Sequence, residues 1–262
     1  MKIYILNDNR PKTPYGSEHG LSWLVEAGGK KVLFDTSPSD IFLRNAEKMG
    51  LSLDDVDTVV LSHGHYDHGN GLVYLDRTPP RRLICHPEAF AGKYHKGSPV
   101  SIGLPLSREE AAARFDLTET REPYRVTDEI IFLGEIPRNN DFESKRTAFV
   151  REDGQEDFMP DDSGLAVITP RGLVVISGCG HAGICNITAH AVQVTGIQKI
   201  RAVMGGFHLK YDDEVTRRTV ACLKKMGVET ARPSHCTELP ALARFYEHFG
   251  NEFVRSGDVL EI

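Results

Sequence analysis

The feature that most constrains this chain is the segment 63–68, which reads His-Gly-His-Tyr-Asp-His and holds four potential metal ligands in six residues. It directly follows Thr58-Val59-Val60-Leu61, a β-branched and apolar run that predicts a buried strand. Glycines 64, 69 and 71 lie in or just after the segment, so we expect a turn where the strand ends. The strand fixes one end of this turn, and the turn allows alternate side chains to converge on a point.

The spacing of these ligands predicts two metal ions. His63 and His65 lie two residues apart and can bind one ion from the same side. Asp67 and His68 are adjacent, point in different directions and can serve a second ion. Imidazole nitrogen and carboxylate oxygen bind zinc, iron or manganese at about 2.0–2.2 Å. A histidine-rich surface loop is the alternative, but packing alone does not require four ligands in six residues.

Composition restricts the class of protein. The 262 residues permit one large domain or two small ones, and 40% hydrophobic with 26% charged residues is typical of a globular chain. The net charge of -6 gives no basic footprint for nucleic acid, and no apolar run is long enough for a signal peptide or a membrane span. The five cysteines are odd in number and form no Cys-x-x-Cys pair, which argues against a disulfide framework. We therefore expect a cytoplasmic protein that binds a small molecule, whereas its oligomeric state stays open.

Further ligand candidates each follow a predicted strand. The strand 173–177 leads into Gly178-Cys179-Gly180-His181, the strand 200–204 precedes His208, and the strand 228–231 precedes His235. We predict that His181 is a metal ligand, because it repeats the strand-then-ligand pattern of the first segment. His235 is predicted to complete the second metal site and His208 to contact substrate or water, although the reverse assignment is open. Cys179 either ligates as a thiolate or is a small buried hydrophobe.

The order of elements predicts a mixed α/β fold. Most of the chain reads as strands with helices inserted, and the expected helices cover residues 40–49, 107–114, 186–194, 213–226 and 241–249. Such an order fits two mixed β-sheets packed face to face with helices outside, an αβ/βα four-layer sandwich. We expect a single domain over residues 1–262. Residues 91–128 are irregular, rich in glycine, proline and charge, and are expected to form a lid or an insertion over the site.

Seven segments together resemble the metallo-β-lactamase superfamily. Within it they are similar to a branch that includes dihydropterin–ribofuranosylaminobenzene phosphate synthases and many metal-dependent hydrolases. The matching segments are 18–22, 61–68, 85–87, 134–138, 177–184, 205–209 and 233–237. The resemblance implies the metallo-β-lactamase-like sandwich and two divalent ions, with zinc as the first choice and manganese, iron or magnesium as alternatives.

The resemblance also implies roles outside the ligand set. An aspartate at the place of Asp35 holds a metal-binding histidine by hydrogen bond in the superfamily, although here it can equally be a turn or capping residue. Many members carry a metal-bridging aspartate in a Ser-Gly-Asp context, where this chain has Ser177-Gly178-Cys179. Three explanations stay open: a cysteine ligand, a bridge from Asp161 or Asp162, or one tight and one weak metal.

Two classes of reaction are consistent with these residues. In a hydrolase, a metal-bound hydroxide would attack an ester, lactone or phosphate ester, and the substrate can carry a phosphate. The other class, implied by the resemblance, is a pterin-type transferase that releases pyrophosphate. Redox di-iron relatives usually have glutamate at the position of His65, so they are a weaker match, and a metal sensor would have a closed coordination sphere. The residues predicted to bind substrate or move protons are Glu18, His19, Asp67 and His208, with Arg138 on an anionic group.

Overall fold

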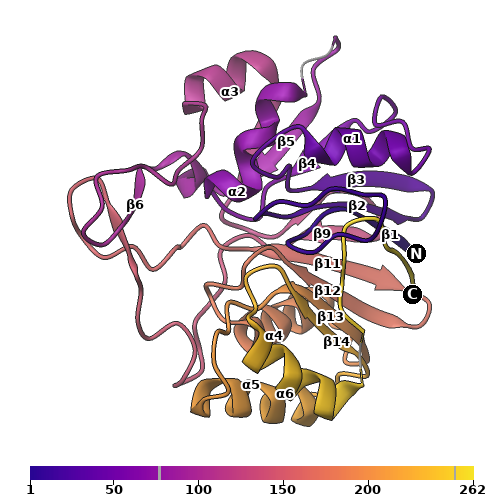
Figure 1. Cartoon of the computed structure of the whole chain (residues 1–262), viewed down its shortest axis with the longest axis vertical. Coiled ribbons are helices and arrows are strands. Elements are labelled where there is room, and N and C mark those ends of the chain that lie inside the picture. The colour runs from indigo at the N-terminus through magenta and orange to yellow at the C-terminus, as the bar shows by residue number, and fades with distance from the viewer. Residues whose placement is uncertain (76–77, 251) are drawn as a thin grey trace.

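A computed structural model describes residues 1–75, 78–250 and 252–262. Two mixed β-sheets pack face to face, and helices cover their outer faces (Figure 1). The first sheet has the order β15 (Val259–Glu261), β1 (Lys2–Asn7), β2 (Ser22–Ala27), β3 (Lys30–Phe34), β4 (Thr58–Val60), β5 (Arg82–Cys85) and β7 (Asp116–Glu119). The second has the order β14 (Ala231–Ser234), β13 (Ile200–Gly206), β12 (Gly172–Ser177), β11 (Gly164–Thr169), β9 (Ile130–Phe132) and β8 (Tyr124–Arg125).

The helices complete a four-layer sandwich. In Figure 1, α1 (Ile41–Lys48), α2 (Tyr66–Gly69) and α3 (Arg108–Arg114) lie on the side of the first sheet. The second sheet is covered by α4 (Ile184–Thr195), α5 (Glu214–Lys225) and α6 (Leu239–Phe249). Short 3-10 helices occupy Asn70–Tyr74 and Pro87–Phe90. The predicted fold class is therefore confirmed.

A central core between the two sheets stabilises this arrangement. Trp23 and Phe34 from the first sheet meet Phe132 and Ile176 from the second, and all four are fully buried. Two further apolar clusters join each sheet to its own helices. Burial of this apolar surface is the main favourable term in folding, and it explains why the central strands read as nearly continuous hydrophobic runs.

Two local features of the backbone follow from the sequence. The hairpin between β2 and β3 turns at Gly28 and Gly29, both with positive φ, as a tight hairpin turn requires. The helix predicted from Ser107 begins with a capping box, because the Ser107 hydroxyl accepts from the Glu110 backbone and the Glu110 carboxylate accepts from the Ser107 backbone.

Three local expectations differ from the structure. The turn expected after β4 contains the short helix α2, which begins directly after His65. The strand expected at 228–231 instead covers Ala231–Ser234, because β14 is an edge strand and tolerates Pro233. Residues 91–128 do not form one insertion: α3 packs in the first layer and β7 extends the first sheet. Only β6 (Lys93–His95) leaves the sheets, and it pairs with β10 (Phe149–Arg151) at the left of Figure 1.

The described part of the chain contains no helix long and apolar enough to cross a membrane.

Candidate metal centre

Polar side chains that follow β1, β3, β4, β12, β13 and β14 meet at one edge of the sandwich. Strands β3, β4 and β5 run parallel to one another, as do β12, β13 and β14, so the carboxyl ends within each set lie together. The residues delivered by these ends and by the end of β1 are Asn9, Asp35, the segment 62–68, Cys179, His181, His208 and His235. Residues up to 226 positions apart in sequence therefore share one site.

The first group of ligand atoms consists of three imidazoles. His63 Nε2 lies 3.0 Å from His65 Nδ1, and the His181 ring lies 5.0 Å from both of those rings. Ligands held tetrahedrally at 2.0–2.1 Å from an ion lie roughly 3.3 Å from each other, so the spacing suits a shared ion. Nε2 of His181 is buried and has no hydrogen-bond partner in the described structure. A metal ion satisfies such an orphaned nitrogen, and the residues present therefore fit the implied group.

The second group combines a carboxylate with two imidazoles. His68 Nε2 lies 3.0 Å from His235 Nε2, and Asp67 Oδ2 lies 3.4 Å from the same His235 nitrogen. The His68 and His235 rings are each oriented by a hydrogen bond at Nδ1. His68 Nδ1 donates to Asp35 at 2.6 Å, and His235 Nδ1 donates to Asn9 Oδ1 at 2.9 Å. Each ring is thereby held in the tautomer that presents Nε2 to an ion.

Protonation in the site follows from burial and from neighbouring carboxylates. Burial lowers the pKa of His63 and of His181 well below the usual range, and it lowers the pKa of His65 to about 3. These three rings are thus neutral at pH 7, as metal ligands must be. Burial also lowers the pKa of His68, but Asp67 and Asp35 outweigh it and raise this pKa to about 9. The two groups consequently differ in charge, with the carboxylates gathered around the second.

Cys179 is within reach of both ligand groups, whereas Asp161 and Asp162 bond to other residues. The Cys179 Sγ belongs to three sets of ligand atoms, each with all atoms within 4.8 Å of one another. The first includes His63 and His181, the second His68 and His235, and the third His208 and Cys236. Asp161 instead accepts from Lys93 Nζ at 2.9 Å and from the Gly64 backbone at 2.8 Å, and Asp162 accepts from the Ala182 backbone. Among the described residues, neither aspartate belongs to such a set.

Asp35 supports the centre as the resemblance implies. Its Oδ1 accepts from the Ser62 backbone, and its Oδ2 accepts from the Ser62 hydroxyl and from His68, all within 2.7 Å. Ser62 Oγ in turn accepts from His63 Nδ1 at 2.9 Å. One fully buried carboxylate therefore orients a histidine of each group.

We expect Asp35→Asn to weaken binding of at least one metal ion by about 10–100-fold, because the amide cannot accept from His68 and from Ser62 as the carboxylate does. Asparagine tolerates the positive φ of 58° at this position, so the backbone should be retained. Competition with a chromophoric chelator measures the affinity. Asp40→Asn, which breaks only an exposed ion pair with Arg44, is the control. Equal affinities in both variants would contradict the role of Asp35.

The support around His235 was missed from the sequence. Asn9 accepts from His235, and its amide nitrogen donates to His19 Nδ1 at 3.1 Å and to the His235 carbonyl at 3.0 Å. Asp8 accepts from the backbone N–H groups of Asn9 and His235. Both residues follow β1, so the same strand-then-polar pattern that indicated the ligands also marks them.

The other predicted site residues fall into two classes. His19 and His208 contact the centre: His19 Nε2 donates to Asp67 at 3.2 Å, and the His208 ring lies 4.3 Å from His181. Glu18 and Arg138 are engaged elsewhere. The Glu18 carboxylate accepts from the backbone and hydroxyl of Ser39, and Arg138 donates to the carbonyls of Phe158 and Met159. These contacts favour loop support for both residues, and their predicted catalytic and substrate-binding roles stay predictions.

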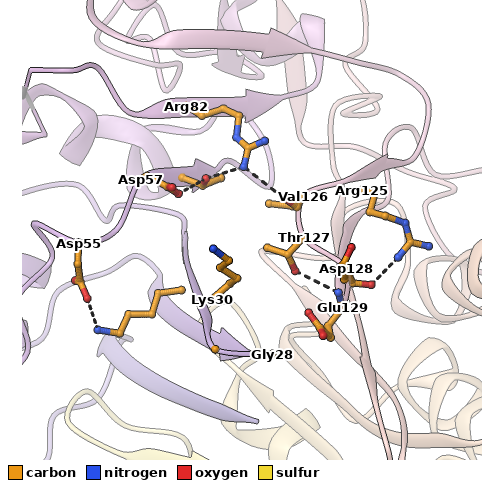
Figure 2. A pocket seen from close by; sticks show the side chains of 13 residues that line it. Gly28, Lys30, Asp55, Asp57, Arg82, Arg125, Val126, Thr127, Asp128 and Glu129 are labelled. Atoms are coloured by element: carbon orange, nitrogen blue, oxygen red, sulfur yellow. Dashed lines mark hydrogen bonds and ion pairs between the residues drawn. The ribbon is translucent and has the colours of Figure 1, made fainter.

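Two cavities lie at opposite ends of the strands. One of about 510 Å³ adjoins the centre and is lined by His181 and His208. A larger one of about 600 Å³ lies where β4 and β5 begin (Figure 2). There Arg82 donates to the Val126 carbonyl and Arg125 to the Asp128 carbonyl, so these cations are already engaged. His181 of the first group lines the first cavity, and no described residue of either ligand group lines the second.

Comparison with known proteins shows the family to which the chain belongs. Residues 15–186 match the family model of the metallo-beta-lactamase superfamily. The chain belongs to the metallo-β-lactamase superfamily. It is 32% identical to the 7,8-dihydropterin-6-methyl-4-(beta-D-ribofuranosyl)-aminobenzene-5'-phosphate synthase of Methanocaldococcus jannaschii, over 97% of this chain and 94% of that protein.

Two solved structures extend the comparison. Tm1679, described as a metal-dependent hydrolase of the beta-lactamase superfamily, is 34% identical with a TM-score of 0.88, and the match covers 100% of this chain and 99% of that one. Zn(2+)-bound PqqB from Methylobacterium extorquens is 12% identical with a TM-score of 0.60 over the whole of both chains, and it shares the fold. As a superfamily member, the chain is expected to bind divalent metal.

Proposed function

We propose that this protein is a metal-dependent hydrolase of a small ester that carries an anionic group, with zinc as the first-choice metal. The observation that carries the proposal is a pair of cations beside the metal centre. Lys145 and Arg146 line the same cavity as His181 and His208, both cations are exposed, and neither has a carboxylate partner in the described structure. Unpaired cations at the mouth of a cavity attract and orient anionic ligands.

The remaining walls of the cavity suggest the rest of the substrate. Phe142, Phe207, Leu209 and Val215 line it together with the two cations. Two carboxylates, Glu143 and Asp213, also line it, but both accept hydrogen bonds from backbone N–H groups. A smaller cavity beside it is also lined by Arg146, His181 and His208. An apolar wall with a few convergent polar groups is typical of small-molecule sites. We infer a substrate with an apolar body and an anionic end.

Side chains of the chain supply positioning and proton transfer. Two divalent ions, when bound, provide Lewis-acid activation of water and of the scissile bond. His19 stands at the exposed edge of the second group, and its hydrogen bond to Asp67 raises its pKa, so it can hold a proton near neutral pH and pass it to a leaving group. His208 faces the cavity beside His181 and can contact the substrate.

A pterin-type transferase that releases pyrophosphate is the second candidate, supported by the 32% identity to the archaeal synthase. Parallel assays separate the two. The hydrolase proposal expects turnover of bis(p-nitrophenyl) phosphate or a phosphorylated lactone in water, abolished by a chelator and restored by zinc. No hydrolysis of any of these esters, together with pyrophosphate release from a pterin diphosphate and an arylamine, would overturn it in favour of the transferase.

We expect Arg146→Ala to raise KM for p-nitrophenyl phosphate by about tenfold, since a hydrogen bond to a charged group contributes about 1.5 kcal/mol. The KM for p-nitrophenyl acetate, which is neutral, should stay unchanged. Lys30→Ala removes an exposed cation from the other cavity and is the matched control. A similar change in KM for both esters would contradict anion recognition by Arg146.

A further inference from the structure

We propose that Cys179 is a thiolate ligand shared by both metal ions, and that it makes the centre selective for thiophilic metals. The inference rests on the metal centre of the proposed function. Its test reads metal coordination rather than turnover, so the two can fail separately.

The position of the sulfur is the first observation. Cys179 Sγ lies 3.2 Å from His68 Nε2, and it forms one compact set with His63 and His181 and another with His68 and His235. Each set has all its ligand atoms within 4.8 Å of one another. A single atom within reach of both sets is where a bridging ligand must stand.

The second observation is the buried ring nitrogen Nε2 of His181, which has no hydrogen-bond partner in the described structure. The Cys179 side chain is itself buried, with 3% of the residue exposed. A buried thiol beside orphaned imidazole nitrogens is typical of a metal site and not of an apolar core.

The loop that carries Cys179 is fixed by close backbone packing. A Cβ added at Gly178 would lie 2.0 Å from Ser62 Oγ, and one added at Gly206 would lie 2.9 Å from the Cys179 Cα. The Cys236 thiol donates to the Cys179 carbonyl at 3.2 Å. Because the loop is held from both sides, the sulfur has a fixed position before any ion arrives, which favours binding.

In the proposed centre, each ion has the same number of protein ligands. His63, His65 and His181 would provide three ligands to one ion, and Asp67, His68 and His235 three to the other, with the sulfur as the fourth for both. Binding releases the thiol proton to solvent, because only the thiolate ligates. Soft thiolate favours zinc, iron and cobalt over magnesium and manganese. The inference therefore disfavours magnesium and manganese among the candidate metals.

The test is a titration of metal-free protein with Co(II), followed by its sulfur-to-cobalt charge-transfer absorption and by the number of ions bound. We expect wild type to bind two ions and to show the band, and Cys179→Ser to lose it. Cys185→Ser should keep the band, because Cys185 lies in the apolar cluster between the second sheet and its helices. Cys236 forms a further set of possible ligand atoms with Cys179 and His208, so Cys236→Ser is the decisive comparison. It should keep the band, and loss of the band in Cys236→Ser but not in Cys179→Ser would overturn the assignment to Cys179. Should Cys179→Ser fail to fold, Cys179→Asp offers a carboxylate of similar reach, and it should bind two ions without the band.

A pair of ligand variants separates a bridging from a terminal sulfur. His181→Ala and His235→Ala should each bind one Co(II) and each keep the band, since the sulfur belongs to both sites. Loss of the band in one of them would overturn the bridge. Two ions bound to wild type without any band would overturn the cysteine ligand but leave the proposed function standing. No cobalt bound at all would overturn the proposed function as well.

Discussion

Replacing His181 by alanine is expected to remove one of two metal ions and to lower kcat/KM for an ester substrate by about 10³-fold. The metal contribution to transition-state stabilisation is several kcal/mol, and each 1.36 kcal/mol corresponds to a factor of ten in rate. His181 is the only ligand of its group that comes from the second sheet, since His63 and His65 both follow β4. Without it, the first ion keeps only the two imidazoles of one loop and the proposed Cys179 thiolate.

Elemental mass spectrometry of freshly purified protein gives the number of ions per chain beside the kinetics. His190→Ala is the control, because His190 lies on α4, donates to the Leu133 carbonyl and contacts no ligand group in the described structure. It should keep both ions and most of the activity. One ion per chain in wild type, unchanged in His181→Ala, would contradict the assignment and favour a mononuclear site on His63 and His65.

The sequence was sufficient where chemistry is local. The ligand run at 63–68 and the start of the helix at Ser107 each depend on a few consecutive residues, so spacing alone indicates them. The sandwich followed from the order of strands and helices and from the family resemblance. The position of α2 and the shift of β14 were not predictable in this way, because sheet edges and strand ends depend on partners distant in sequence.

Residue roles that depend on tertiary contacts could not be predicted from the sequence. Asn9 bonds to His235 across 226 positions, and although it follows a strand, nothing local in the sequence indicates which histidine it supports. Arg138 was predicted to bind an anion, yet it donates to two backbone carbonyls, because the fold brings a loop within its reach. Arg146, on which the substrate proposal rests, cannot be distinguished from Arg138 in the sequence. What separates the two arginines is that Arg146 lines the cavity beside His181, whereas Arg138 is engaged by backbone carbonyls.

Lys93 shows how the segment expected to be a lid is tied to the centre. Its ammonium, with the side chain 1% exposed, lies 2.9 Å from Asp161 and 3.5 Å from Asp157, which are equally buried. Asp161 also accepts from the backbone of Gly64, inside the ligand run. A Cβ at Gly64 would lie 1.8 Å from the Ala89 carbonyl oxygen, so this backbone has little freedom to move. The ion pair therefore holds β6 and the ligand loop together.

We expect Lys93→Met to reduce the free energy of unfolding by about 3–5 kcal/mol, because methionine fills the space but leaves two buried carboxylates without their cation. For a chain of this size the melting temperature should fall by roughly 10 °C. Metal affinity should fall as well, because an unpaired Asp161 carboxylate is expected to turn toward solvent and lose its hydrogen bond from the Gly64 backbone. Thermal and urea unfolding of the metal-free protein measure the first effect, and chelator competition measures the second.

Two further variants decide whether charge is the cause. Lys96→Met breaks an ion pair with Glu156 in which both side chains are about half exposed, so it should cost at most about 1 kcal/mol. Lys93→Met combined with Asp161→Asn removes one orphaned carboxylate and keeps an acceptor for Gly64, so it should recover part of the lost stability. If the double variant is less stable than Lys93→Met by the full cost of a second lesion, the two residues act independently. In that case β6 would be held by packing alone, and the electrostatic link from the segment to the ligand loop would be wrong.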